Sequence, residues 1–317
     1  MRPRNFTMVL GVVVLASLLA VSGLAACSAA EGRGSVPAAA SARPRGAGDA
    51  VATDAGSAGL LPWSPPRLSN PTTIDVATLT PRPGAPRIIR LDPRRDYRIR
   101  MPDTALRRPL VILGGRNVVL IGGAISIPYQ GPDASIEQRR GLLLIKQTGT
   151  VHVEGLLLTG ADLSEGIQIA SPEAVVQLQN IRVEQLHARD QVRFSDNHPD
   201  IVQPWGGVRR LRIGALTGQT NYQGLFLKEA LGPIGAVQLW KVNIKGSASG
   251  RQLLWREGQF DISVNQVYLE PAKGRSLQQA LWGRWTNVLA GPPPNGDFVP
   301  RGLAGPNYRS AGYAPGS

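Results

Sequence analysis

One spacing of apolar residues recurs along the middle of the chain, and it restricts the possible folds more than any other feature of the sequence. Apolar side chains occupy the first, third, sixth and eighth positions of a short segment, as in Val151, Val153, Leu156 and Leu158. Copies of this segment begin at Val119, Val151, Val176, Leu211, Val237 and Ile262, the first and fourth in a looser form. Such spacing is typical of a structural repeat.

Each copy predicts two short strands joined by a bend. Alternation on either side of the gap turns one face of each strand inward, so that Leu178 should point inward and Gln179 outward. Small or turn-prone residues stand at the gap, namely Gly122, Gly123, Gly155, Asn180 and Gly214. A third apolar strand precedes the copies, at 142–145, 167–169, 201–203, 225–227 and 253–255. Three strands in about 25 residues form one coil of a solenoid, and the coils must stack because one coil cannot bury its own apolar face.

This pattern resembles that of the pectate-lyase-like superfold over roughly residues 88 to 270, and the tight bend is similar to the short turn between the second and third strands of that superfold. The resemblance implies an all-β fold, a single-stranded right-handed parallel β-helix with irregular N- and C-terminal caps. It implies no single activity, because one superfold carries many functions. An antiparallel β-sandwich is the alternative, and the regular repeat disfavours it.

The N-terminus predicts export and lipid anchoring. Arg2 and Arg4 precede an apolar stretch from residue 6 to about residue 21, which is short for a membrane span. The following Leu24-Ala25-Ala26-Cys27 resembles the lipobox of bacterial lipoproteins, in which the cysteine becomes diacylated. Cys27 is the only cysteine in the chain, which suits this role. We therefore expect attachment to the extracytoplasmic face of the cell membrane through Cys27; the alternative is an ordinary signal peptide with a chance cysteine.

Composition divides the chain into four segments. Residues 1–26 are expected to be the signal peptide, and residues 27–58, rich in Ala, Gly and Ser, a flexible tether. Residues 59–270 are expected to form the β-helix with a Pro-rich N-terminal cap. Residues 271–317 are expected to form a C-terminal cap over the open end of the last coil, with a short amphipathic helix over 276–285.

The charge balance indicates anionic partners. The chain has 35 Lys and Arg against 22 Asp and Glu, a formal net charge of +13. Such an excess suits an acidic polysaccharide, a cell-envelope glycan or a lipid surface. Because the export signal separates the protein from intracellular nucleic acid, we expect no nucleic-acid partner.

Two insertions lengthen the coils, at about 128–140 and 185–199, and the resemblance places such loops beside a groove. The second leads into Asp196, His198 and Asp200. These residues could orient His198 as a general base, and the carboxylates of Asp196 and Asp200 could bind calcium. The same stretch is also good turn sequence, whose side chains bond to their own backbone, and this alternative stays open.

The phase of the first strands decides which residues face the groove. If Ile201, Leu225 and Leu253 point inward, alternation turns these residues outward: Asp200, Val202, Phe226, Lys228, Leu254 and Arg256. Gln168 faces outward one coil earlier. Lys228 and Arg256 would then stack and attract an anion, although cations at strand ends are often only solvated. A slip of one residue would invert these assignments.

Two functions fit these observations. The first is a protein that acts on or binds acidic polysaccharide or cell-envelope glycan, a candidate polysaccharide lyase; the resemblance implies a Lys or Arg base, often with calcium. Its candidate catalytic residues are His198, Asp196, Asp200, Lys228 and Arg256, and its candidate ligand-binding residues are Gln168, Phe226, Leu254 and Trp205.

The second function is a non-catalytic binding or structural module of the cell envelope. The absence of the Asp-Asp, Gly-His-Gly and Arg-Ile-Lys motifs of polygalacturonase-like hydrolases motivates it. His152 lies between Val151 and Val153 and is expected to be a surface residue on the outward face. If residues 271–317 covered the outward strip of the first strands, both binding hypotheses would weaken.

Overall fold

Parallel strand pairing dominates the structure. The computed structural model describes residues 60–82, 84–187, 199–247 and 252–315. Within these residues every strand pairing is parallel, and the strands belong to one 18-stranded sheet. The fold is therefore all-β with a large parallel sheet, an arrangement compatible with a β-helix.

The regular elements are short apart from four long strands. The strands are β1 (Thr72–Asp75), β2 (Arg87–Leu91), β3 (Tyr97–Arg100), β4 (Leu110–Gly114), β5 (Val118–Ile121), β6 (Ala124–Ser126), β7 (Arg140–Ile145), β8 (Thr150–Glu154), β9 (Leu157–Thr159), β10 (Glu165–Leu186), β11 (Asp200–Gln203), β12 (Val208–Thr220), β13 (Gln223–Lys228), β14 (Ile234–Gly246), β15 (Leu254–Glu257), β16 (Asp261–Glu270), β17 (Leu281–Trp282) and β18 (Val288–Ala290). The helical elements are the 3₁₀ turns η2 (Val76–Thr78), η3 (Ile136–Gln138), η4 (Glu229–Leu231) and η5 (Gln278–Ala280). In the described part, no helix has the length and apolar composition needed to cross a membrane. The helix expected over 276–285 is wrong, because only η5 and then β17 form there.

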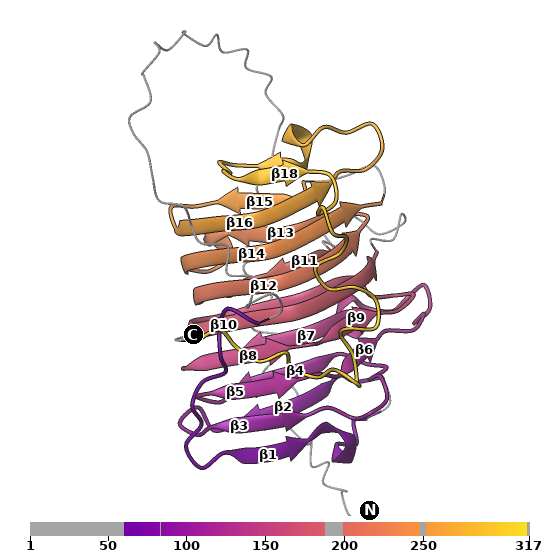
Figure 1. Cartoon of the computed structure of the whole chain (residues 1–317). Helices are drawn as coiled ribbons and strands as arrows, with labels where there is room; N and C mark the ends of the chain where they lie inside the picture. The colour runs from indigo at the N-terminus through magenta and orange to yellow at the C-terminus, as the bar shows by residue number, and fades with distance from the viewer. Residues whose placement is uncertain (1–59, 83, 188–198, 248–251, 316–317) are drawn as a thin grey trace, which may run out of the picture. The chain divides into compact units, whose positions relative to one another are not determined.

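The strands form two ladders, which run from β1 to β18 in Figure 1. The first ladder contains β2, β4, β7, the start of β10, β11, β13, β15 and β17. The second ladder contains β1, β3, β5, β6, β8, β9, the rest of β10, β12, β14, β16 and β18. Each strand pairs with strands one repeat before and after it, so that Ile167 lies opposite Leu142 and opposite Val202.

The apolar repeat packs as continuous rows in the core. Leu178 pairs with Val153 on one side and with Ile213 on the other, and all three side chains are fully buried. The inward phase predicted for β8, β10 and β12 is thus confirmed. The first copy was placed one residue too late, because Val118 rather than Val119 pairs with Val151.

The bend between the two halves of each repeat uses left-handed backbone. Positive φ angles occur at Gly122, Gly155, Asn180, Ala215, Lys241, Gln266 and Asn287. The expected bend residue Gly214 is therefore one position early, because Ala215 carries the positive φ of 57°. Gly155 is additionally required by packing, since a Cβ there would lie 2.1 Å from the ring of Tyr308.

The C-terminal segment extends the ladders and then runs along their side. β17 pairs with β15, and β18 pairs with β16, so the strand repeat continues beyond residue 270. Residues 291–315 then return along the second ladder, where Gly305 N–H donates to Gly155 O at 2.9 Å and Val299 N–H donates to Thr217 Oγ1 at 2.9 Å. We call residues 291–315 the strap. The strap runs along the side of the second ladder, whereas the sequence predicted that it would cover the open end of the last coil.

Gln179 shows how much the terminal segments cover. Its side chain points away from the core, as predicted, yet it is fully buried. Its amide oxygen accepts a hydrogen bond from Trp63 N–H, and its amide nitrogen donates one to Trp63 O. The N-terminal residues near Trp63 therefore lie on the outer face of β10.

We expect Leu178→Ala to lower the free energy of unfolding by about 2–5 kcal/mol, because it opens a cavity between stacked layers. Ser263→Ala, at an exposed position of β16, should change it by less than about 0.5 kcal/mol. Gln179→Ala should cost about 1–3 kcal/mol, since it removes the partners of the partly buried backbone N–H and C=O of Trp63. Denaturant melts measure all three, and equal losses at Leu178 and Ser263 would contradict the register.

Candidate functional site

A row of aromatic and amide side chains lies on the outer face of the first ladder. Register and strand alternation align Gln168, Gln203, Phe226, Trp255 and Trp282, which we call the outer row. The rings of Phe226 and Trp255 have centroids 5.4 Å apart, and those of Trp255 and Trp282 are stacked at 4.6 Å. Gln168 Nε2 donates to Gln203 Oε1 at 3.4 Å. The row is thus continuous across five strands, with Trp282 exposed, Gln168, Phe226 and Trp255 half-buried, and Gln203 buried.

Val202 and Leu254, expected on this strip, belong to the core instead, and the outward expectation for Asp200 is also wrong, because it lies two residues before Val202 on β11 and is fully buried. Val202 and Leu254 both pair with Leu225, and all three side chains are fully buried. From the sequence, either Leu253 or Leu254 could lie opposite Leu225. The structure places Leu254 there, so the prediction that Leu254 points outward is wrong. The outward expectations for Gln168 and Phe226 are confirmed, whereas Leu254 is replaced on the outer row by Trp255.

The expected stack of two cations is also wrong. Lys228 pairs in register with Glu257, and its Nζ lies 3.3 Å from Glu257 Oε1. Arg256 donates to the backbone oxygens of Phe260, at 2.6 Å, and of Arg284, at 3.2 Å. These two cations therefore already have partners, and they do not form a shared anion site.

A pair of buried carboxyl groups lies at the start of β10 and β11. Glu165 forms an ion pair with Arg140 at 2.8 Å, yet burial dominates and raises the Glu165 pKa to about 7. Asp200 is fully buried, and neither of its carboxyl oxygens accepts a hydrogen bond within the described part of the chain. Burial, followed by the charge of Glu165, raises the Asp200 pKa well above its ordinary value. Burial therefore favours the neutral form of both groups, and the Glu165 pKa of about 7 lies near neutrality.

Several predicted residues cannot be placed in this cluster. Asp196, His198 and Cys27 lie outside the described residues. Trp205 follows β11 and is 38% exposed, but it does not belong to the outer row. Among the described residues, no group of three or more His, Cys, Asp or Glu is arranged to hold a metal ion.

His152 is buried rather than superficial, which corrects the expectation from the sequence. It points away from the core, but its side chain has no exposed area, and its Nε2 lies 2.8 Å from Glu154 Oε2. Tyr308 and Tyr313 of the strap each donate a hydroxyl hydrogen bond to Glu154 at 2.7 Å. Burial alone would raise the Glu154 pKa, but the hydrogen bonds from His152, Tyr308 and Tyr313 outweigh it and lower that pKa.

This polar network holds both ends of the described chain on the second ladder. Leu61 N–H donates to Gly312 O, and Ala314 N–H donates to Leu61 O, each at 2.9 Å. The strap also carries Asp297, whose carboxylate accepts from Arg182 and Asn243 at 3.0 Å. These contacts lie on the outer face of the second ladder, so the strap does not cover the outer row of the first.

Comparison with known proteins adds no assignment, since no family model, no curated protein and no solved structure matches the chain.

We expect Asp200→Asn to stabilise the protein at about pH 7 and to have little effect at about pH 4. The raised pKa means that the folded state holds the Asp200 proton more tightly than the unfolded chain, so stability falls as pH rises from the unfolded value toward the folded one. Asparagine does not titrate and removes this loss. Asp261→Asn, at an exposed position, serves as the control in denaturant melts at both pH values. Destabilisation by Asp200→Asn at neutral pH would show that the carboxylate is charged and paired.

Proposed function

We propose that this protein is an exported lipoprotein whose β domain is a right-handed parallel β-helix of the pectate-lyase-like superfold, and that it binds acidic polysaccharide or cell-envelope glycan on the outer row. Three features support the fold assignment. The strands pair in parallel one repeat apart, each repeat contributes to two ladders, and left-handed bends recur in the second ladder. The lipobox-like segment at Cys27 supports the anchoring.

The outer row is the observation that carries the binding proposal. Aromatic rings pack against the apolar faces of sugars, and side-chain amides donate to and accept from hydroxyl groups. Trp282 is the last ring of the stack and is 47% exposed, and no other ring of the described residues stacks on it. Because the row is carried by paired strands rather than by a loop, it presents a rigid strip that suits an extended polymer.

An acidic glycan is favoured over a neutral one by the net charge, which is +13 for the whole sequence and 13 − 2 = +11 once Arg2 and Arg4 are removed with the signal peptide. Electrostatic attraction of this kind acts over the whole surface and does not require a cation on the outer row itself. The glycan would be steered by the basic surface and held by the aromatic and amide groups.

Binding without catalysis is the better-supported form of this function. Lys228 and Arg256, two of the candidate catalytic residues, have partners in an ion pair and in backbone hydrogen bonds. The lyase remains a second candidate because burial raises the Glu165 pKa to about 7, which suits a general acid at neutral pH. Calcium belongs to the lyase proposal: Asp200 is the described group that would bind it, as a deprotonated carboxylate. Incubation with polygalacturonate or alginate, with and without calcium, tests the lyase through the ultraviolet absorbance of unsaturated products.

We expect Trp282→Ala to weaken binding to an acidic polysaccharide by about tenfold or more, equivalent to about 1.4 kcal/mol, because Trp282 is the most exposed ring of the outer row and Trp is enriched among binding hot spots. Affinity electrophoresis in polygalacturonate or alginate gels measures the change. Trp240→Ala is the matched control, because Trp240 lies on the second ladder. Equal retardation of the parent and both variants would remove the outer row as the binding site.

We expect Cys27→Ser to release the protein from the membrane fraction or to block its maturation, because a diacylated cysteine supplies the two acyl chains that stable anchoring requires. Fractionation of cells that produce the parent and the variant measures this. Sedimentation of a processed Cys27→Ser protein with membranes would contradict lipid attachment at Cys27.

A further inference from the structure

Basic residues are concentrated at the N-terminal end of the ladders. Residues 60–127 contain eleven Arg, no Lys and four Asp or Glu, an excess of seven positive charges. The described residues after 127 contain 16 Lys and Arg against 13 Asp and Glu, an excess of only three. The charge of the domain is therefore asymmetric along the direction in which the strands stack.

Many of these arginines have no acidic partner. Asp75, Asp92 and Asp96 form ion pairs with Arg100, Arg94 and Arg116. Six further arginines are exposed, and none has a carboxylate within ion-pair distance in the described part of the chain: Arg67, Arg82, Arg90, Arg95, Arg98 and Arg107. Later in the described chain six exposed cations also lack a carboxylate at ion-pair distance, but they are spread over residues 146–309, whereas the six arginines here lie within residues 67–107. Unneutralised guanidinium groups at one end constitute a site for anions.

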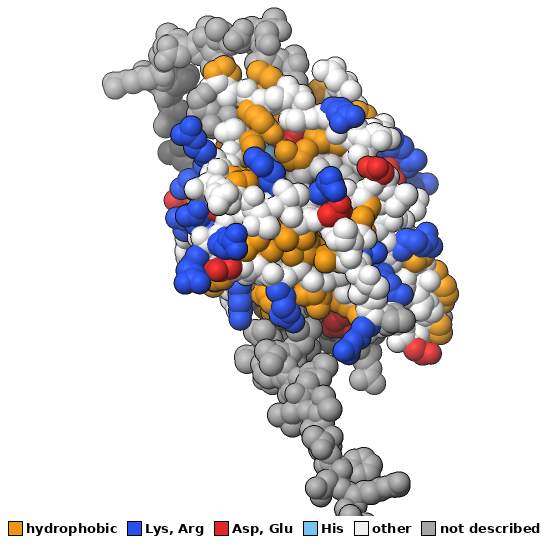
Figure 2. Space-filling view, turned by 90° about the horizontal axis from the view of Figure 1, so that it is seen from below, with side chains coloured by type: hydrophobic (Ala, Val, Ile, Leu, Met, Phe, Trp, Pro, Cys, Tyr) orange, Lys and Arg blue, Asp and Glu red, His pale blue; other side chains and the backbone are white. Residues whose placement is uncertain are grey.

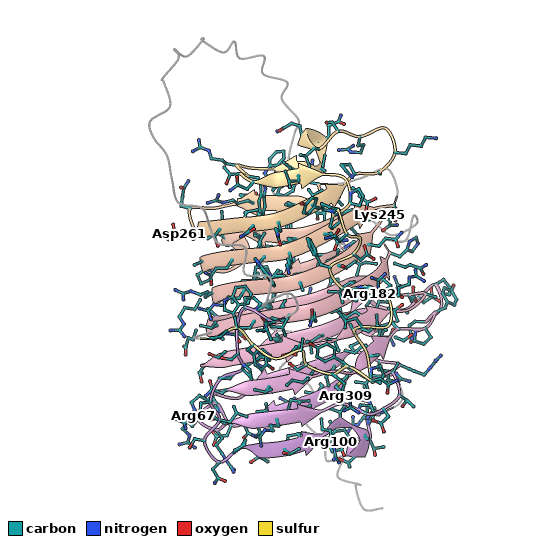
Figure 3. All side chains as sticks on the ribbon, in the orientation of Figure 1. Arg67, Arg100, Arg182, Lys245, Asp261 and Arg309 are labelled. Atoms are coloured by element: carbon teal, nitrogen blue, oxygen red, sulfur yellow. The ribbon has the colours of Figure 1, made fainter. Side chains whose placement is uncertain are left out.

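Apolar side chains are interspersed with these arginines. Figure 2 views the molecule from below, toward the end that carries β1, and shows Lys and Arg side chains distributed around and between patches of hydrophobic side chains. Ile88 of β2 is 37% exposed, and Ile74 of β1 is half-buried. Figure 3 places Arg67 and Arg100 at this end, whereas Lys245 and Asp261 lie toward the other.

We propose that the N-terminal end of the ladders is a docking surface for the headgroups of anionic phospholipids. Guanidinium groups bind phosphate oxygens in a bidentate manner, and exposed apolar side chains among them can enter the headgroup region. This combination favours a lipid surface over an acidic glycan, because the cations surround an end face instead of following one row of sugar-binding groups. The inference rests on the proposed lipid anchoring for its biological setting, but the surface itself is independent of the outer row.

The test uses the mature chain from residue 27 with Cys27→Ser, so that neither the signal peptide nor an attached lipid itself causes binding. Co-sedimentation compares vesicles of phosphatidylcholine alone with vesicles that contain about one third phosphatidylglycerol. We expect binding to the anionic vesicles at low salt, loss of binding at high salt, and little binding to phosphatidylcholine alone.

Two variants with the same change in net charge locate the surface. In one, Arg67, Arg90, Arg98 and Arg107 are replaced by Gln; in the other, the exposed residues Arg209, Arg210, Lys273 and Arg284 are replaced by Gln. We expect the first to lose about tenfold or more in vesicle affinity and the second to stay within about threefold of the parent, since cations far from the surface contribute little. Denaturant melts establish that both variants fold.

Three outcomes would overturn the proposal: no binding of the parent to anionic vesicles, equal losses in the two variants, or a loss in the first variant only toward polygalacturonate. The Trp282→Ala variant separates this inference from the glycan proposal, because it should retain vesicle binding while losing affinity for the polysaccharide.

Discussion

Parallel pairing between strands one repeat apart is the interaction on which the rest of the structure depends. It satisfies backbone hydrogen bonds between repeats, and it places equivalent positions of successive repeats side by side. Rows of identical orientation follow, aliphatic on the inner face and polar or aromatic on the outer face. A side chain in such a row is therefore defined by its register as much as by its type, since a shift of one residue moves it to the opposite face.

This dependence explains what could be predicted from the sequence. In the second ladder, apolar residues alternate on both sides of a bend. Two strands and a turn must therefore agree on which residues point inward, and the inward position predicted for Leu178 is confirmed. In the first ladder, adjacent apolar residues leave the phase open. Leu253 and Leu254 are both buried, and the local sequence does not show that Leu254 pairs with Leu225. The same ambiguity misplaced Val119, whose neighbour Val118 occupies the inward position.

The candidate site was only partly predictable for a related reason. Gln168 and Phe226 could be placed by alternation, but the contribution of Trp255 and Trp282 depends on the register of strands that lie far apart in sequence. The burial of His152 depends on Tyr308 and Tyr313, which lie more than 150 residues further along the chain. No local pattern reports such contacts. A Tyr-rich C-terminus opposite an outward His–x–Glu is the one signal that could have suggested them.

The two outer faces of the sheet differ in what they require from a covering segment. On the second ladder, Glu154, Gln179 and Arg182 are buried polar groups, and their hydrogen bonds are completed by Tyr308, Trp63 and Asp297 from the terminal segments. Removal of those segments would leave the groups without these partners, so the strap is held there by specific bonds. On the first ladder, the rings of the outer row pack against one another, and among the described residues the buried carboxyl of Asp200 accepts no hydrogen bond from the strap. The strap and the N-terminal residues near Trp63 are thus directed to the second ladder by polar complementarity, and the described terminal segments leave Trp282 of the outer row exposed.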